Sequence, residues 1–302
     1  MSIPAAEAVA VARPPASALL EWFRRRPAAG YLLLLSPALL FLLVLYAYPL
    51  VRIFWISLSE PTLSLDHYWR FFSVPVYVRV IGVTFKVAVV VTLVCLILGY
   101  PTAYLLTTVS ATRRNFLLIM VLLPFWTSLL VRTYAWIAIL QREGVINKLL
   151  RGAGLLDEPV QMVYNTLGVT IGMTHVLLPF MILPLYSVMS GIDKSLGKAG
   201  QTLGATPAQA FRHVFVPLSL PGVGAGSLLV FISALGFFVT PAVLGGPRDM
   251  LISQLISMQV NVTLNWGFAS AIAFILLTAT LAIYVVYDRF FGLDKMWGGV
   301  GR

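Results

Sequence analysis

The residue types that most often do chemistry are few and scattered in this 302-residue chain. The three histidines, His67, His175 and His213, lie far apart and lack the short spacing of metal ligands. The stretch GIDKSLGKA (191–199) resembles a phosphate-binding loop, but five residues separate its glycines where the motif has four, and Ala199 replaces the Ser or Thr that would hold magnesium. No nucleophile elbow is present. We therefore predict neither an enzyme nor a bound cofactor.

A more informative pattern lies in residues 190–221, where polar residues separate two long apolar runs. Asp193 is a suitable N-cap for a short helix over 194–203. Gly204 follows at the place where a glycine in the left-handed conformation would end that helix. These signals predict a short helix with a defined beginning and a defined end.

A second helix is expected to begin directly afterwards. Thr206 and Gln209 form a Thr-x-x-Gln capping box, and Pro207 suits the first helical position. Pro217 and Pro221 are expected to limit how this helix enters the next apolar run. The loop is thus predicted to consist of two short capped helices joined at a glycine hinge.

The second helix carries a mixed apolar and basic surface. Gln209, Phe211, Arg212 and His213 stand almost in a row, a combination that suits a groove on another protein. The alternative is an amphipathic helix that lies in the membrane interface without a partner. We favour docking to a protein.

These residues must be positioned by an unusually apolar chain, 59% hydrophobic and 11% charged, whereas soluble domains are about 25% charged. Runs of 18 or more residues with few charges are typical of helices that cross a bilayer. Six such runs predict an all-α integral membrane protein with six transmembrane helices and a short coupling loop between the fourth and fifth. The runs are Tyr31–Trp55, Val80–Leu106, Phe116–Leu140, Tyr164–Met189, Leu218–Thr240 and Phe268–Tyr287.

The distribution of Lys and Arg predicts that both termini are cytoplasmic. With the N-terminus inside, the inner segments hold twelve of the 21 basic residues and the outer loops hold six, as the positive-inside rule requires. Basic residues beside spans also account for the net charge of +10 without a nucleic-acid partner. The expected domains are a disordered basic cytoplasmic tail (1–29), a six-span domain (30–290, with the coupling loop at 190–217) and a cytoplasmic C-terminal tail (291–302).

All eleven acidic residues lie outside the six runs. A carrier driven by protons or sodium ions usually needs a carboxylate inside the membrane to bind the coupling ion. This pattern argues against a stand-alone secondary carrier and indicates that the energy for uphill transport comes from another subunit.

Three cations lie within the runs: Arg52 at the end of the first, Lys86 and Arg132. Lys86 is near the outer end of its run, from where its stem reaches the headgroups. Arg132 is deeper, in PFWTSLLVRTYAW (124–136). Two interpretations of Arg132 stay open: it extends outward beside interfacial aromatic residues, or it faces an internal cavity or pairs with carbonyls of a helix broken at Pro124.

The loop resembles the Glu-Ala-Ala cytoplasmic loop of ABC-importer permeases. The family pattern is Glu-Ala-Ala, three residues, Gly, nine residues, then Ile-x-Leu-Pro, and here 198–200, Gly204 and 214–217 follow the same spacing. Lys replaces Glu, Gly replaces the second Ala, and Val replaces Ile and Leu. The resemblance implies contact with an ATPase subunit through Lys198, Ala199, Gly200, Gly204, Gln209, Phe211, Arg212, Val214 and Pro217.

The likeness extends over nearly the whole chain from about Tyr31. Segments 124–136, GVIN (144–147) and LLPFMILPLYSVM (177–189) are similar to permeases of the spermidine/putrescine transporter family. Membership would imply a bacterial inner-membrane importer made of two permeases, two cytoplasmic ATP-binding subunits and an extracytoplasmic solute-binding protein. The second permease is expected to be a paralogue, and lipid surrounds the spans.

A polyamine is the substrate that this resemblance favours. The path is predicted to include Trp126, Arg132, Tyr134 and His175, although for His175 a bond to a neighbouring helix is favoured over ligand binding. Aromatic faces suit a polycation, whereas the spans supply no carboxylate for it. Relatives also carry other small organic solutes, such as amino-acid derivatives and opines, so a permease for one of these is the alternative.

Overall fold

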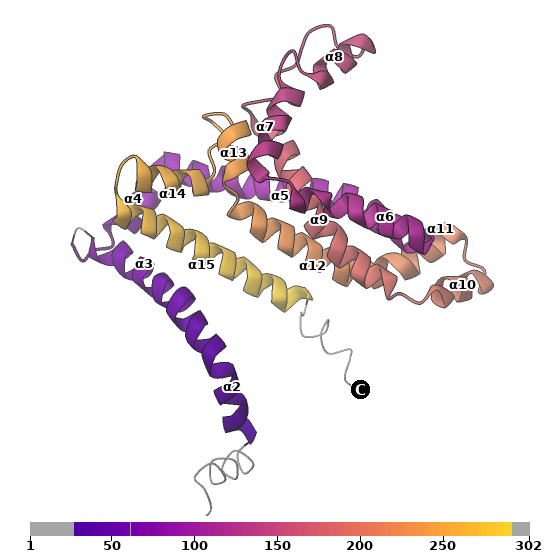
Figure 1. Cartoon of the computed structure of the whole chain (residues 1–302), viewed down its shortest axis with the longest axis horizontal. Coiled ribbons are helices and arrows are strands. Elements are labelled where there is room, and N and C mark those ends of the chain that lie inside the picture. Colours follow the sequence, from indigo (N-terminus) through magenta and orange to yellow (C-terminus); the bar gives the residue numbers. More distant parts are fainter. Residues whose placement is uncertain (1–26, 61, 292–302) are drawn as a thin grey trace, which may run out of the picture. The chain divides into compact units, whose positions relative to one another are not determined.

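The computed structural model describes residues 27–60 and 62–291, and every regular element in those ranges is a helix (Figure 1). The all-α class predicted from the apolar runs is thereby confirmed. The chain divides into two compact units, residues 1–55 and 56–302, and each is described on its own. The predicted tails, 1–29 and 291–302, lie almost wholly outside the described residues.

The described part of the first unit is an apolar helical rod. α2 (Pro27–Leu42) passes through a π-helical turn, η1 (Leu43–Ala47), into α3 (Tyr48–Ser59), whose last four residues belong to the second unit. The segment Leu34–Ser59 is long and apolar enough to cross a membrane, and its most apolar stretch has no buried residue. Such a surface requires lipid or another apolar partner.

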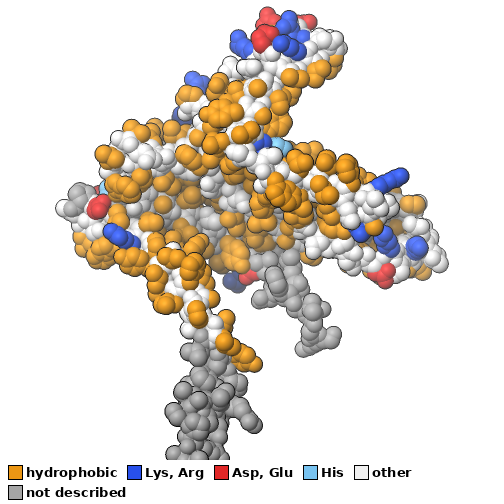
Figure 2. Space-filling model, in the orientation of Figure 1, with side chains coloured by type: hydrophobic (Ala, Val, Ile, Leu, Met, Phe, Trp, Pro, Cys, Tyr) orange, Lys and Arg blue, Asp and Glu red, His pale blue; other side chains and the backbone are white. Residues whose placement is uncertain are grey.

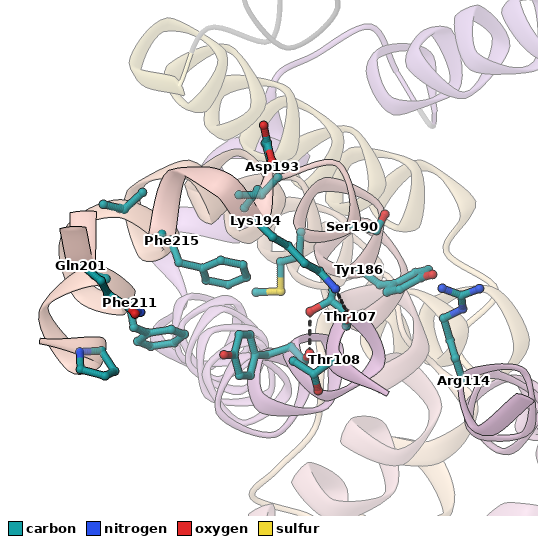
Figure 3. Close-up of a pocket in the computed structure, with 17 residues that line it drawn as sticks. Thr107, Thr108, Arg114, Tyr186, Ser190, Asp193, Lys194, Gln201, Phe211 and Phe215 are labelled. Atoms are coloured by element: carbon teal, nitrogen blue, oxygen red, sulfur yellow. Dashed lines mark hydrogen bonds between the residues drawn. The ribbon is translucent and has the colours of Figure 1, made fainter. Parts of the chain in front are cut away.

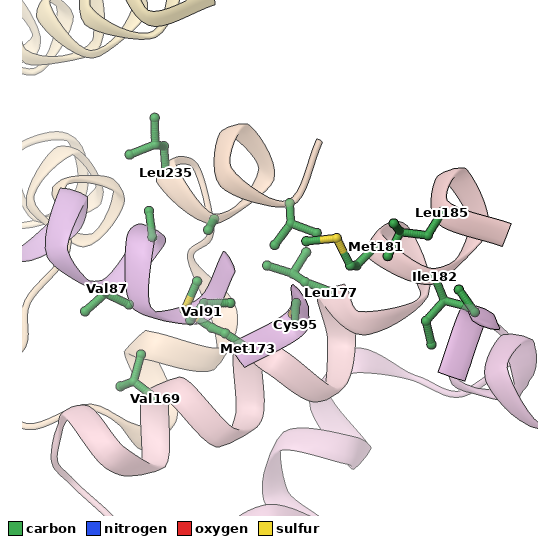
Figure 4. Packing of buried hydrophobic residues seen from close by; sticks show 14 of the residues in the cluster. Val87, Val91, Cys95, Val169, Met173, Leu177, Met181, Ile182, Leu185 and Leu235 are labelled. Carbon is green, nitrogen blue, oxygen red and sulfur yellow. The ribbon is translucent and has the colours of Figure 1, made fainter. Parts of the chain in front are cut away.

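Three long helices form the core of the second unit: α5 (Pro75–Thr108), α9 (Thr166–Ser190) and α12 (Val216–Leu235). Cys95 is fully buried there, and its thiol donates to the Thr174 carbonyl oxygen (Sγ to O, 3.8 Å). Lipid is as apolar as these side chains, so close packing stabilises such contacts rather than transfer from water. Figure 4 shows the interlocking side chains, which include Val87, Val91, Cys95, Val169, Met173, Leu177, Met181, Leu185 and Leu235.

Small residues let segments of this unit approach one another closely. At four glycines an added Cβ would come within 2.6 to 3.0 Å of an atom in a neighbouring segment: Gly168, Gly172, Gly222 and Gly226. At Gly226 that atom is the Met181 Sδ, 2.8 Å away. A real Cβ needs more room. Gly222 and Gly226 therefore let α12 approach α9, and Gly172 lets a neighbouring segment with Thr240 and Leu244 approach α9.

A second apolar cluster joins three further helices around the buried Phe71 and Phe268. His67 lies beside Phe268, with its Nε2 atom 2.6 Å from the Glu60 carbonyl oxygen, so its role here is structural. The helices are α4 (Asp66–Ser73), α14 (Ile252–Asn261) and α15 (Trp266–Phe291).

The third apolar run is not one straight helix, and the continuous span predicted over 116–140 is wrong. Segments Ala111–Trp126 and Leu129–Gly152 are bent by 100°. Pro124 has no N–H with which to continue the α-helical ladder, and the helix tightens into a 3₁₀ turn around it. The elements are α6 (Ala111–Leu122), η2 (Leu123–Trp126), α7 (Leu129–Leu140) and α8 (Val145–Gly152).

The fifth run also has different limits from the predicted 218–240. Its helix begins at Pro207 and ends at Leu235. After Gly236 the chain forms a separate short helix, α13 (Val239–Leu244), which packs against α7 and α9. The described residues therefore contain five helices long and apolar enough to span a membrane, or six if the bent pair is counted as one span.

Most charged side chains on the visible face of the second unit lie toward its ends. Figure 2 shows Lys, Arg and acidic side chains at the α8 tip, around α6 and α10 and near α4, with hydrophobic side chains over most of the surface between them. A bilayer-spanning protein needs such a separation, because charges are costly within the hydrocarbon.

Candidate functional site

The candidate coupling loop, residues 190–217, begins with a capped helix. α10 (Lys194–Thr202) follows Asp193, whose Oδ1 atom accepts a hydrogen bond from the Ser195 N–H (2.8 Å). This hydrogen bond to the backbone holds the pKa of the Asp193 carboxyl below its ordinary value. The helix predicted over 194–203 is confirmed, and it ends one residue earlier.

Gly204 closes α10 in the left-handed conformation, with φ at +92°. Its N–H bonds the Gln201 carbonyl (3.0 Å), and the Ala205 N–H bonds the Gly200 carbonyl (3.1 Å). These two bonds are the Schellman arrangement, which satisfies carbonyls at a helix end. The predicted glycine stop is confirmed.

The start of the second helix, α11 (Pro207–Ala210), also follows the prediction. The Thr206 Oγ1 accepts from the Gln209 N–H (3.3 Å), and the Gln209 Oε1 accepts from the Thr206 N–H (2.8 Å). Pro207 occupies the first helical position, where its missing N–H costs nothing. Both arms of the capping box are present.

The second helix is not the separate short helix that the sequence predicted. A π-helical turn, η3 (Phe211–Phe215), carries α11 into α12, so that one helix runs from Pro207 to Leu235. The Val216 N–H bonds the Phe211 carbonyl, five residues back. This wider turn stands directly before Pro217, whose ring would meet a carbonyl in a regular α-helical turn. The prediction of a separate second helix is wrong, and the second arm of the loop is the first part of the fifth span.

One face of the loop is open, and it holds most of the residues predicted to contact an ATPase subunit. The apolar side chain of Leu203 is 89% exposed and that of Leu196 is 46% exposed. Gly200 and Val214 are half-buried between the two arms. The exposed candidates are Lys198, Ala199, Gly204, Gln209, Arg212 and Pro217. Phe211 is also partly exposed (36%), but its ring lies on the other face of the loop.

The other face of the loop contacts the end of α5. The Tyr104 ring packs edge-on against the rings of Phe211 (5.2 Å) and Phe215 (5.1 Å). The Lys194 Nζ donates to the Thr107 carbonyl oxygen at 3.2 Å (Figure 3). Sequence reasoning missed Tyr104 and Thr107, because a contact between residues about a hundred positions apart leaves no local pattern.

At the break in the third span, Arg132 reaches back toward the end of the preceding helix. Its Nη2 donates to the carbonyl oxygens of Pro124 and Thr127, the latter at 2.8 Å, and its Nε donates to the Thr127 Oγ1 at 3.2 Å. The Pro124 carbonyl also accepts from the Thr127 N–H (3.4 Å) and the Thr127 hydroxyl (3.1 Å), so Arg132 adds to a local cap at Pro124 and supplies the donor at the Thr127 carbonyl. Of the two interpretations of Arg132, the structure shows pairing with the carbonyls of a broken helix.

The four residues predicted for a substrate path are not brought together at one cavity. Arg132 borders a cavity of about 360 Å³ between the break, α9 and α12. His175 borders another of about 280 Å³ between α5, α6 and α9. Trp126 and Tyr134 line neither of these two cavities and are 78% and 60% exposed. Their role in a solute path stays a prediction.

His175 makes the interhelical bond that the sequence favoured. The Trp136 Nε1–H on α7 donates to the His175 Nδ1 on α9 (3.2 Å), and the two rings meet edge to face at 5.6 Å. The neutral ring then carries its proton on Nε2.

The segment after α7 is fastened by Asn147, the last residue of the GVIN stretch. Its amide is fully buried and donates to the carbonyl oxygens of Gln141 (3.1 Å) and Val160 (2.9 Å). Its Oδ1 accepts from the Val160 N–H (2.9 Å). One side chain thus fixes both ends of the loop that carries α8.

The fold defines the class of protein as a polytopic helical membrane protein whose fifth span is extended by a capped loop. The chain belongs to the binding-protein-dependent transport system inner membrane component family, whose sequence model matches residues 30–292. It is therefore a multi-pass inner-membrane permease subunit of a binding-protein-dependent ABC importer, a transmembrane component without a catalytic role.

Two relatives show how far the similarity reaches. The chain is 36% identical over 228 residues to the spermidine/putrescine transport system permease protein PotB of Haemophilus influenzae, covering 75% of this chain and 79% of the relative. It is 31% identical over 303 residues to the inner membrane ABC transporter permease protein YdcU of Escherichia coli, covering 93% and 95%.

A solved structure shares the fold. A chain of a bacterial alginate ABC transporter, crystallised with an alginate pentasaccharide-bound periplasmic protein, superposes with a TM-score of 0.71. The match covers 91% of this chain and 98% of the other at 18% sequence identity. At that identity the likeness concerns the fold alone.

Proposed function

We propose that this permease imports a polyamine, such as spermidine or putrescine, delivered by an extracytoplasmic binding protein. The observation that carries the proposal is the identity of 35–36% to permeases named for spermidine and putrescine transport, over three quarters of this chain. Exposed and half-buried aromatic rings near the broken span, such as Trp126 and Phe125, offer faces that suit an organic cation.

The coupling loop is proposed to lie in the cytoplasm and to seat on the ATP-binding subunit, with both termini on the same side. Its exposed Leu203 and Leu196 beside Lys198 and Arg212 supply the apolar and basic surface that a protein groove accepts. Two ATP-binding subunits and a second, paralogous permease would complete the complex. The six-span domain is assigned to 30–290, between cytoplasmic tails at 1–29 and 291–302.

The loop has two routes by which its movement would reach the bundle. Its second arm is continuous with α12, so a displacement of α11 is passed directly along a stiff helix. Its inner face holds the end of α5 through the Tyr104 contacts with Phe211 and Phe215. Because α5 and α12 are both core helices, ATP-driven closure of the motor subunits would shift the bundle between two packed states.

The substrate is tested on the complete importer in proteoliposomes with its own binding protein. We expect ATP-dependent uptake of labelled spermidine, and competition by unlabelled putrescine but not by an opine. The matched control is the same complex without the binding protein. Uptake of the opine alone would contradict the polyamine assignment while leaving the permease function intact.

A second candidate substrate is another small solute that carries a carboxylate, such as an amino-acid derivative or an opine. One observation favours it: the residues that line the two cavities beside the broken span include Arg132 but no Asp or Glu. The same uptake experiment separates the two substrate classes.

A further inference from the structure

The largest cavity we describe lies behind the coupling loop, on the side away from the exposed face of α10. Its volume is about 560 Å³, well within the range of small-molecule sites. Its walls are formed by the last residues of α5 and α9, by the first turns of α6, and by α10, α11 and η3. Contact with an ATP-binding subunit through the exposed face of the loop does not require a cavity on the opposite side. The residues that line the cavity therefore need a separate explanation.

Two cations from different elements reach this cavity. Figure 3 shows the Lys194 ammonium and the Arg114 guanidinium directed toward each other, with the Tyr186 ring between them. Lys194 uses one N–H on the Thr107 carbonyl and keeps two. Within the described residues neither cation is in an ion pair.

The acidic side chain that borders the cavity does not neutralise these charges. Asp193 accepts the Ser195 N–H as the cap of α10, and Figure 3 shows its carboxylate pointing away from Arg114 and Lys194. Of the hydroxyl groups in the lining, those of Thr108 and Ser190 donate to carbonyl oxygens of their own helices (2.9 and 3.0 Å), which leaves the Tyr186 hydroxyl as a donor. The site therefore offers N–H and O–H donors around an unneutralised positive charge, which is the chemistry that binds phosphate.

We propose that this cavity binds the phosphate group of an anionic phospholipid headgroup. Three span ends meet at the cavity, which places it at the level of the headgroups, and Tyr104 and Tyr186 are residues typical of that level. Basic pockets between spans on the cytoplasmic side are suited to anionic lipid headgroups. The rings of Phe211 and Phe215 give the cavity an apolar wall that the glycerol and upper acyl chain would cover.

The consequence is a lipid-dependent coupling loop. A bound phosphate would join Arg114, at the start of α6, to Lys194, at the start of α10, and so hold the loop against the membrane surface. The inference rests on the proposed cytoplasmic placement of the loop.

The test uses the whole importer, purified with its ATP-binding subunit, in nanodiscs of equal phosphatidylglycerol and phosphatidylcholine. Retained lipid is counted by native mass spectrometry after release. We expect the wild type to keep phosphatidylglycerol, Arg114→Gln and Lys194→Gln each to weaken its retention about fivefold, and the double variant about thirtyfold. Arg113→Gln is the matched control, because Arg113 is exposed and does not line the cavity.

Two outcomes would overturn the proposal. Equal phosphatidylglycerol retention in the wild type and the double variant would remove the site. Binding of inorganic phosphate by the delipidated complex, with the same dependence on Arg114 and Lys194, would assign the cavity to a free anion instead of a lipid. Loss of the ATP-binding subunit from the wild type would contradict the proposed coupling. Phosphatidylglycerol bound to the permease would still be measured in that case, so the two proposals fail separately.

Discussion

Two helix interruptions in this molecule are closed by different chemistry. Between α10 and α11 the caps are local: Gly204 and Ala205 bond back to α10, and Thr206 and Gln209 cap each other. Between η2 and α7, Ser128 makes no side-chain cap. There the Thr127 carbonyl accepts from Arg132, five residues further on, and the Pro124 carbonyl accepts from Arg132 as well as from the Thr127 N–H and hydroxyl.

We attribute the difference to the proposed surroundings of the two breaks, with the loop at the membrane surface and the bend within the lipid. At a membrane surface water can satisfy a free carbonyl, so weak neutral caps of about 1 kcal/mol are sufficient. Within lipid no water is available, and an unsatisfied carbonyl costs several kcal/mol. A guanidinium, with five N–H donors in a fixed fork, can satisfy several acceptors at once. Arg132 therefore has a structural reason to lie in the span, apart from any contact with solute.

The largest effect is expected from Arg132→Ala, which removes the donors at the membrane break. Hydrogen bonds to charged groups contribute about 1.5–3 kcal/mol each, so the loss of several should destabilise the subunit by about 3 kcal/mol or more. We expect earlier thermal inactivation of the purified complex and uptake reduced at least tenfold, as about 1.4 kcal/mol corresponds to a factor of ten.

The matched control for that experiment is Lys86→Ala, which removes an exposed cation from another span. Arg132→Lys keeps the charge but not the fork, and should restore little of the stability. Small and equal effects of Arg132→Ala and Lys86→Ala would show that the break needs no charged cap.

A smaller effect is expected from Gly204→Val at the surface break. A side chain at φ of +92° costs about 1–2 kcal/mol, and a β-branched one is especially poor there. The position is otherwise open, with no atom within 4 Å of an added Cβ, so the penalty comes from the backbone alone. We expect more ATP to be hydrolysed per solute transported, or loss of the ATP-binding subunit.

Gly204→Asn tests the cause, because Asn tolerates the left-handed conformation far better than Val. It should keep most of the coupling between hydrolysis and transport. Unchanged transport and assembly in Gly204→Val would contradict the assigned role of the hinge.

The smallest effect concerns pH and compares the two caps of the loop. The backbone hydrogen bond lowers the folded-state pKa of Asp193 below its unfolded value. Its stabilisation is therefore complete at neutral pH and is lost as the pH falls through the folded-state pKa, in the range below about pH 4. We expect hydrogen-exchange protection of the first α10 amides to decline there.

The internal reference is the Gln209 amide, which the neutral Thr206 hydroxyl caps. Its protection should not follow the same titration, and Asp193→Asn should abolish the pH dependence of α10. Parallel loss of protection at both caps in acid would indicate general unfolding of the loop.

Local signals made the ends of α10 and the start of α11 predictable. Asp193, Gly204 and the Thr206–Gln209 pair each act on backbone groups within a few residues, so their effect can be read from a short stretch of sequence. The apolar runs likewise identified the long helices, because lipid exposure selects composition over 18 or more residues.

Hydropathy carried no information about bends and continuity. The third run reads as one span although it turns by 100° in the Pro124 region, because the apolar residues continue on both sides of the bend. The opposite error occurred before Pro217, where the sequence predicted a short helix separate from the next run and the helix instead continues through a wider turn. The contact of Arg132 with the Pro124 carbonyl depends on that bend, so it could be stated only as one of two interpretations.

The π-helical turn at Phe211–Phe215 sets the directions in which the side chains of α12 point relative to the loop. Each residue in a helix rotates the next side chain by about 100°, so deleting one residue there would rotate all of α12 against the loop, and with it Gly222 and Gly226 away from α9. The same arrangement stands in the first span, where the turn Leu43–Ala47 is likewise followed by one residue and then a proline, Pro49. The number of residues between Gly204 and Pro217 is thus under a tighter constraint than their identity.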